Sequence, residues 1–137
     1  MALSDAKIVM LPKEEDFRGN LSVIEEFTHI PFAIERAYWI YDVPGGEKRY
    51  GHAFKEQHEF IVALSGSFDI ILNDGKEEKV FSLNRSYQGV YVPNKIWRKI
   101  ENFSTNAVAL VLSSTHYSPE DYIEEFNEYL QYINCNE

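Results

Sequence analysis

The stretch RYGHAFKEQHEFIVALSG, residues 49–66, places polar and chemically active side chains directly before an apolar strand. His52 stands near its start, His58 and Glu59 follow, and residues 60–64 are apolar. A short run rich in branched and aromatic residues predicts a strand that packs in a core. An imidazole beside such a strand is also suited to proton transfer, because histidine titrates near neutral pH. The stretch therefore predicts both a core strand and a place for acid–base chemistry.

Short strands are expected on both sides of this stretch. Asp74 and Gly75 lie between the alternating residues 67–72 and the run at 78–83, and an Asp-Gly pair in that setting predicts a hairpin. Further strands are expected at residues 6–11, 21–27, 32–43, 88–92, 96–101 and 107–113. Together these are roughly nine short strands spaced by about 8–12 residues, a pattern typical of an all-β sandwich or barrel.

The period of the apolar residues changes near the C-terminus. Ser118 and Pro119 are typical of the N-cap and first position of a helix. Apolar residues at helical spacing follow them, namely Tyr122, Ile123, Phe126, Tyr129, Leu130 and Ile133. We expect this helix to pack on a sheet or on a partner subunit. Because the chain shows no linker, internal repeat or low-complexity tract, residues 1–137 are predicted to form a single domain.

The composition narrows the class of protein. The chain has 137 residues, of which 45% are hydrophobic and 15% are aromatic, with a net charge of −9 and a pI near 4.9. This acidity disfavours binding to nucleic acid or to an anionic membrane. The single cysteine, Cys135, cannot form an internal disulfide, which favours a reducing cytoplasm. The N-terminal residues do not predict a secretory leader, and no run is long enough to span a membrane.

The spacing of the polar residues resembles the metal-binding pattern of the cupin barrels, which is His-x-His, then Glu, a Gly after the strand and a late His. On this chain the ligand positions hold His52, Phe54, Glu59 and Arg98. Phe54 offers no lone pair, and the guanidinium of Arg98 repels a cation. His58 is disfavoured as a substitute ligand, since strand alternation turns it away from Glu59. Two donors are too few for a tight site, so we expect neither metal nor cofactor.

Arginines and aromatic residues accompany the histidine in the predicted strands. An inward-facing arginine needs an anion, either an internal glutamate or a ligand phosphate, and the candidates are Arg36, Arg49 and Arg98. Aromatic rings suit either the core or stacking on a base or sugar, and here they are Tyr38, Trp39, Tyr41, Tyr91 and Trp97. His52 is either a base that removes a proton next to a ketone or a hydrogen-bonded structural histidine. The residues alone leave these alternatives open.

Runs along nearly the whole chain resemble the sugar 3,4-ketoisomerases, which act on dTDP-4-keto-6-deoxyglucose. They are RGNLSVIEE (18–26), IPFAIERAYWIYDV (30–43), RYGHAFK (49–55), ALSGS (63–67), NDG (73–75), GVYVP (89–93), Trp97 and YSPEDYIEEFNEYLQYI (117–133). The resemblance implies an all-β, cupin or jelly-roll barrel with a C-terminal α-helix, usually a homodimer and free of metal. It implies that the ketone moves from C4 to C3 of the sugar through an enediol. The product would feed an aminotransferase in the biosynthesis of 3-amino-3,6-dideoxy sugars of surface polysaccharides.

The resemblance also implies roles for single residues. His52 matches the first His of the family's His-x-His motif and is the predicted base. Phe54 stands where family members often have the second His, so either His52 acts alone or Tyr38 or His58 assists it. The predicted substrate contacts are Arg36, Arg49, Glu59, Tyr91 and Arg98.

Other functions are also compatible with the residues. The missing second histidine at Phe54 suits a catalytically silent module that binds a sugar nucleotide. A 3,5-epimerase acting on the same substrate also begins with proton removal at C3, so His52 does not distinguish the two reactions. A metal-dependent cupin enzyme is the third alternative.

Overall fold

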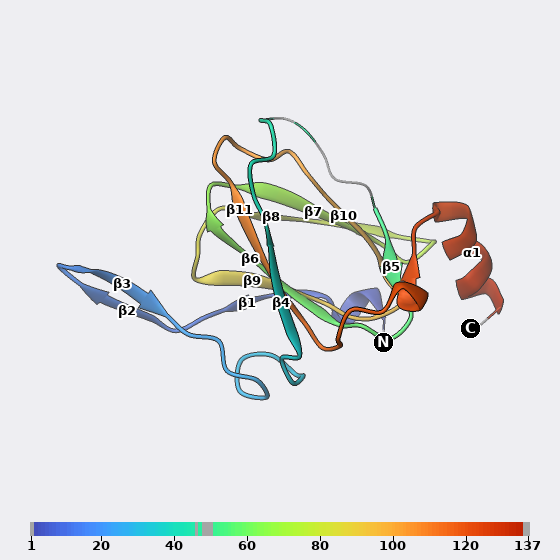
Figure 1. Ribbon diagram of the computed structural model, residues 1–137, viewed down its shortest axis with the longest axis horizontal. Helices are drawn as coiled ribbons and strands as arrows, with labels where there is room; N and C mark the ends of the chain where they lie inside the picture. The colour runs from blue at the N-terminus through green and yellow to red at the C-terminus, as the bar shows by residue number, and fades with distance from the viewer. Residues whose placement is uncertain (1, 46, 48–50, 136–137) are drawn as a thin grey trace.

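The computed structural model describes residues 2–45, 47 and 51–135, and its main body consists of two antiparallel sheets (Figure 1). The larger sheet has the order β1-β9-β6-β11-β4 and the smaller one β10-β7-β8. The strands of the larger sheet are β1 (Lys7–Met10), β9 (Gln88–Val92), β6 (Glu59–Ser65), β11 (Val108–Ser113) and β4 (Arg36–Ile40). Those of the smaller sheet are β10 (Trp97–Glu101), β7 (Phe68–Asn73) and β8 (Glu78–Leu83). The predicted all-β architecture with a C-terminal helix is confirmed.

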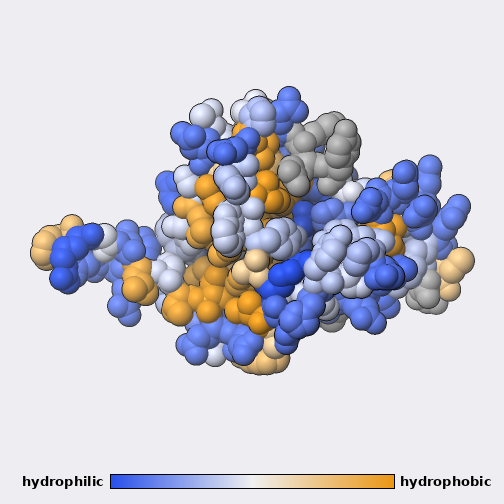
Figure 2. Space-filling model, viewed as in Figure 1, coloured by the Kyte–Doolittle hydropathy of each residue, from blue (hydrophilic) through white to orange (hydrophobic). Residues whose placement is uncertain are grey.

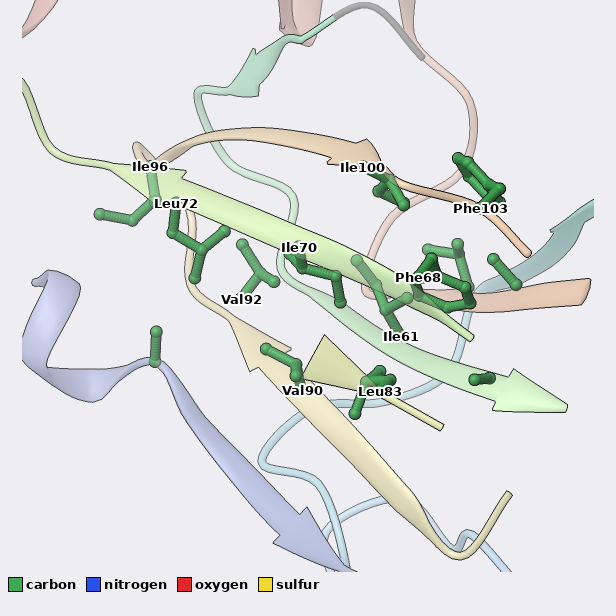
Figure 3. Close-up of a cluster of buried hydrophobic side chains, with 14 of the residues drawn as sticks. Ile61, Phe68, Ile70, Leu72, Leu83, Val90, Val92, Ile96, Ile100 and Phe103 are labelled. Atoms are coloured by element: carbon green, nitrogen blue, oxygen red, sulfur yellow. The ribbon is translucent and has the colours of Figure 1, made fainter. Parts of the chain in front are cut away.

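The main core lies between these two sheets (Figure 3). Alternation along each strand sends every second side chain inward, as Phe68, Ile70 and Leu72 do from β7. From the larger sheet, Ile61 and Val90 belong to the same cluster of buried side chains (Figure 3). The central stretch therefore forms a core strand, as the sequence predicts.

The opposite face of the larger sheet carries a second apolar cluster. Its buried members are Leu11, Ile30, Phe32, Phe60, Val62, Tyr91 and Leu112. Phe60 and Tyr91 are cross-strand partners, so they point to the same side of the sheet. Because β6 is covered on both faces, its burial is continuous from Glu59 to Ala63.

The C-terminal segment corrects one expectation. Pro119–Asp121 is a short 3-10 helix, Tyr122–Ile123 forms strand β12, and the α-helix α1 spans only Phe126–Cys135. Tyr122 pairs with Phe54 of β5 (Ala53–Phe54), so the first part of the expected helix is held as a strand. Ser118 therefore does not cap α1. The start signal at Ser118 and Pro119 is thus followed by a single short 3-10 helix, which ends where Tyr122 pairs with Phe54, 68 residues earlier in the sequence (122 − 54).

Helix α1 packs at the end of the two-sheet body, near β5 and β12 (Figure 1). Tyr129 is fully buried there, and its hydroxyl donates to the carbonyl oxygen of Lys95 at 2.8 Å. Ile133 lies close to Gly75, whose positive φ of 94° belongs to the predicted Asp-Gly turn. The helix thus covers the β7–β8 turn.

The N-terminal part also differs from expectation. No strand is expected from the sequence at residues 13–20, but β2 (Lys13–Asp16) and β3 (Gly19–Ser22) form a hairpin that projects from the body (Figure 1). The strand expected at 21–27 stops at Ser22, and the one expected at 32–43 is limited to β4. Every residue of β2 and β3 is exposed. Within the described residues, no helix is long and apolar enough to cross a membrane.

Candidate active site

A large cleft of about 1210 Å³ opens beside β4, the edge strand of the larger sheet. Its lining joins segments that are far apart in sequence: Arg36, Tyr38, Trp39, Ile40, Tyr41, Gly51, His52, Arg98, Tyr122, Glu124 and Glu125. Four of the predicted site residues therefore meet here, namely Arg36, Tyr38, His52 and Arg98. A concave site with several convergent polar groups is the usual form of a small-molecule site.

A buried ion pair lies at the base of this cleft. Arg98 Nε donates to Glu59 Oε1 at 2.7 Å, and Arg98 Nη2 donates to Glu59 Oε2 at 3.1 Å. Burial by itself would raise the pKa of Glu59, but the charge of Arg98 and its hydrogen bonds outweigh burial and lower that pKa. Burial likewise opposes the charge of Arg98, and the facing carboxylate raises its pKa overall. Both groups are therefore charged at neutral pH.

Tyr38 completes this group. Its hydroxyl donates to Glu59 Oε2 at 2.5 Å and accepts from Arg98 Nη2 at 2.9 Å. Burial, followed by the negative charge of Glu59, raises the pKa of Tyr38. The phenol thus stays protonated, and its one proton is committed to the carboxylate.

Gln57 links the ion pair to Arg36, and sequence reasoning missed it. Its Nε2 donates to Glu59 Oε2 at 2.9 Å, while its Oε1 accepts from Arg36 Nη2 at 3.0 Å and from Thr115 Oγ1 at 2.9 Å. Only 2% of Gln57 is exposed. The one available signal was a Gln two residues before Glu59, which places both side chains on the same face of an extended segment.

Arg36 projects from β4 into the cleft. Its guanidinium lies 5.3 Å from the ring centre of Tyr38 and 5.5 Å from that of Tyr117. Its Nε is buried and has no hydrogen-bond partner among the described residues. The Arg36 guanidinium therefore offers its Nε–H as a donor beside the cleft, which suits an anionic ligand.

His52 is held at the cleft wall by its backbone and by two aromatic rings. Its N–H donates to the carbonyl oxygen of Arg98 at 3.0 Å, and the Arg98 N–H donates back to His52 at 2.9 Å. The imidazole centre lies 4.9 Å from the ring of Phe54 and 5.4 Å from that of Tyr122. Phe54 is buried and does not line the cleft. Of the two rings beside His52, only Tyr122 therefore faces the cleft.

His58 and Tyr91 lie elsewhere, and the structure does not bring them to the cleft. His58 Nδ1 and the Tyr91 hydroxyl are hydrogen-bonded at 2.7 Å, and their rings stack with centres 5.9 Å apart. Strand alternation turns them to the face of β6 opposite Glu59. Burial lowers the pKa of His58, so the neutral imidazole is favoured. Arg49, the remaining candidate, lies outside the described residues.

Within the described residues, no three His, Cys, Asp or Glu side chains gather as metal ligands. Glu59, which occupies the cupin ligand position, has both oxygens engaged by Arg98, Tyr38 and Gln57. The donor set therefore does not fit a metal, and the expectation of a metal-free protein stays a prediction for elemental analysis.

The fold and the cleft place the protein in the class of cupin-type proteins with a small-molecule site. The profile of the family described as FdtA (WxcM-like, C-terminal) matches residues 4–134. A curated relative from Aneurinibacillus thermoaerophilus, TDP-4-oxo-6-deoxy-alpha-D-glucose-3,4-oxoisomerase, is 38% identical over 127 residues, which are 93% of this chain and 91% of that protein. The chain belongs to the FdtA, WxcM-like family, as its sequence resemblance predicts.

Solved structures agree with this assignment. A 3,4-ketoisomerase from Helicobacter canadensis is 38% identical, with a TM-score of 0.92 over 95% of this chain and 98% of that one. The sugar 3,4-ketoisomerase QdtA from Thermoanaerobacterium thermosaccharolyticum, solved with TDP, is 32% identical, with a TM-score of 0.93 over 98% of both chains. A mutant of the same enzyme was solved with TDP-4-keto-6-deoxyglucose. An RmlC epimerase from Mycobacterium tuberculosis, at 16% identity and a TM-score of 0.77, shares the fold alone.

Proposed function

We propose that the protein is a TDP-sugar 3,4-ketoisomerase, which converts TDP-4-keto-6-deoxyglucose to the 3-keto isomer. The observation that carries the proposal is the position of His52, the predicted base, on the wall of a cleft shared with Arg36, Tyr38 and Arg98. Relatives that match nearly the whole chain are named for this reaction.

The residues supply the parts that the reaction needs. The C4 ketone acidifies the hydrogen on C3, and the imidazole of His52 removes it and returns a proton to C4. Negative charge builds on the sugar oxygens in the enediolate between these two steps. Arg98 is a fixed cation in a partly closed cleft, and such a charge stabilises the enediolate more than it would in water.

Arg36 is the proposed contact for the diphosphate. Its buried and unengaged Nε, together with an Nη2 held in place by Gln57, supports this role. Arg49 is proposed to assist. Glu59 and Tyr38 are proposed to position Arg98 for the substrate through their hydrogen bonds to its guanidinium.

The test is to follow TDP-4-keto-6-deoxyglucose with the purified protein in D2O by NMR. We expect conversion to the 3-keto sugar with deuterium at C4. If the nucleotide binds but neither conversion nor deuterium exchange occurs, the protein is a silent binding module. Deuterium at C3 and C5 with inversion would instead identify an epimerase.

We also propose that the protein is a homodimer. Half of the surface of Leu64 and 96% of Phe17 are exposed, and apolar residues gather on the face beside the projecting hairpin (Figure 2). A two-stranded hairpin on its own is only marginally stable in water, so a partner surface is expected to support β2 and β3. An apolar groove of about 640 Å³ at the base of the hairpin, lined in part by Ile24, Leu64 and Leu110, is suited to a second copy.

The reaction product suits an aminotransferase as the next enzyme, in the biosynthesis of 3-amino-3,6-dideoxy sugars of surface polysaccharides. A cytoplasmic location is proposed from the single cysteine, because nucleotide sugars and free thiols share that compartment.

A further inference from the structure

The proposed isomerisation requires two protons to move, and His52 accounts for one of them. In the substrate, C3 carries a hydrogen and O3 a proton. In the product, C4 carries the hydrogen and O4 the proton. His52 takes the carbon hydrogen from C3 and gives a proton to C4, so a second group must carry the proton from O3 to O4.

The expected candidates for this second group do not fit. Phe54 carries no proton to transfer. His58 lies on the opposite face of β6, hydrogen-bonded to Tyr91. The single proton of Tyr38 is donated to Glu59, and its oxygen accepts from Arg98.

Tyr122 is a better candidate for the second group. It lines the cleft together with His52, Tyr38 and Arg98. Its ring centre is 5.4 Å from the imidazole of His52 and 4.6 Å from Phe54. Among the described residues, no hydrogen bond engages its hydroxyl.

The backbone fixes this tyrosine opposite the missing histidine. Tyr122 pairs with Phe54 across the β12–β5 ladder, and Phe54 packs edge-on against its ring. The phenol therefore reaches the cleft from beside position 54 on a short strand.

We propose that Tyr122 is a further catalytic residue, which carries the hydroxyl proton between O3 and O4 of the sugar. This inference rests on the proposed isomerase function. As His52 removes the C3 hydrogen, the phenol donates its proton to O4. As His52 protonates C4, the phenolate accepts the proton from O3, so both groups end in their starting states and no further reactant is needed.

The test is Tyr122→Phe, which keeps the ring and its contacts. We expect kcat for TDP-4-keto-6-deoxyglucose to fall ~100-fold or more, the range of a lost acid–base group. Affinity for TDP, measured by calorimetry, and the melting temperature should stay unchanged. Tyr117→Phe is the matched control, because the exposed Tyr117 touches Tyr122 with its ring at 5.8 Å, and removing its hydroxyl should leave kcat unchanged.

A second readout separates catalysis from support. In D2O the variant should exchange the C3 hydrogen of unreacted substrate at least about tenfold more often per product formed. The reason is that His52 still removes and returns a proton at C3, while the transfer of the hydroxyl proton from O3 to O4 is slowed. Turnover within about threefold of the wild type would overturn the role of Tyr122. So would a loss of turnover that leaves this ratio unchanged or that follows weaker TDP binding. If the wild-type protein binds TDP and converts nothing, the isomerase function itself fails.

Discussion

Glu59 and Arg98 form a bidentate ion pair, with Nε and Oε1 2.7 Å apart and both side chains at most 2% exposed. Two charges buried this completely are stable only together, since either one alone would be left without water or a counter-charge. Tyr38 and Gln57 each donate a further hydrogen bond to Glu59 Oε2. The pair therefore fixes the orientation of the Arg98 guanidinium, which lines the cleft.

The first prediction concerns Glu59→Gln. The change leaves the Arg98 charge buried and unpaired, so the free energy of unfolding at pH 7 should fall by about 3–5 kcal/mol. Urea denaturation measures it. Glu101→Gln, which loses only a surface contact of 3.9 Å to Lys99, should change stability by less than about 0.5 kcal/mol. If Glu59→Gln lowers the free energy of unfolding no more than the control does, the ion pair does not stabilise the fold as proposed.

The same pair predicts how stability depends on pH. The pKa of Glu59 in the folded protein lies below its ordinary value, because Arg98 outweighs the effect of burial. Its contribution is therefore complete above the unfolded pKa of about 4.3 and is lost as the pH falls through the lower, folded value. The difference in unfolding free energy between wild type and Glu59→Gln should shrink progressively below about pH 4.3. A difference that stays constant down to pH 3 would argue against this origin.

His52→Asn tests the base. The amide keeps a polar side chain of similar size but accepts no proton, so kcat should fall by about 10²–10⁴-fold while TDP binding persists. Isotope exchange at C3 should disappear together with turnover, which distinguishes this variant from one at Tyr122. His116→Asn, an exposed histidine paired with Glu35, is the control and should behave as wild type. An active His52→Asn protein would exclude His52 as the base.

Gln57→Leu tests the link to Arg36. The leucine removes the acceptor that holds Arg36 Nη2 and also the donor to Glu59. Because Arg36 is the proposed diphosphate contact, KM should rise about tenfold with a smaller change in kcat, equivalent to about 1.4 kcal/mol of binding. Steady-state kinetics with TDP-4-keto-6-deoxyglucose give both values. A variant whose kcat falls with KM unchanged would place Gln57 in the chemical step instead.

Local signals explain the parts of the fold that the sequence predicts correctly. The hairpin at Asp74 and Gly75 forms as expected, because its turn depends on neighbouring residues: the Asp74 carboxylate accepts from two backbone N–H groups within the turn. His52 and Arg98 both occupy ligand positions of the cupin-like spacing, which predicts that they lie close together. Their backbone pairing confirms that proximity.

Long-range contacts explain the parts that the sequence does not predict. Ser118 carries a strong helix-start signal, yet Tyr122 is held as a strand by Phe54. Glu59 on β6 is the ion-pair partner of Arg98 on β10, which lies 39 residues later in the sequence and in the other sheet. Gln57 belongs to the same network, and no local pattern distinguishes it from an exposed glutamine.

The last prediction concerns the proposed dimer. Phe17 is 96% exposed at the turn of the β2–β3 hairpin, where the guanidinium of Arg18 lies 5.5 Å from its ring centre and almost all of the ring faces solvent. If a second copy covers the hairpin, Phe17→Ser removes an apolar contact worth about 1.5–3 kcal/mol for each buried ring, and a dimer buries two of them. Light scattering should therefore show a dimer for the wild type and a shift toward monomer for the variant at micromolar concentration. Val80→Ser changes an equally apolar but separate exposed position on β8, and it should leave the mass unchanged. A wild-type protein that is monomeric at these concentrations would refute the proposal, and the hairpin would then have to be stable without a partner.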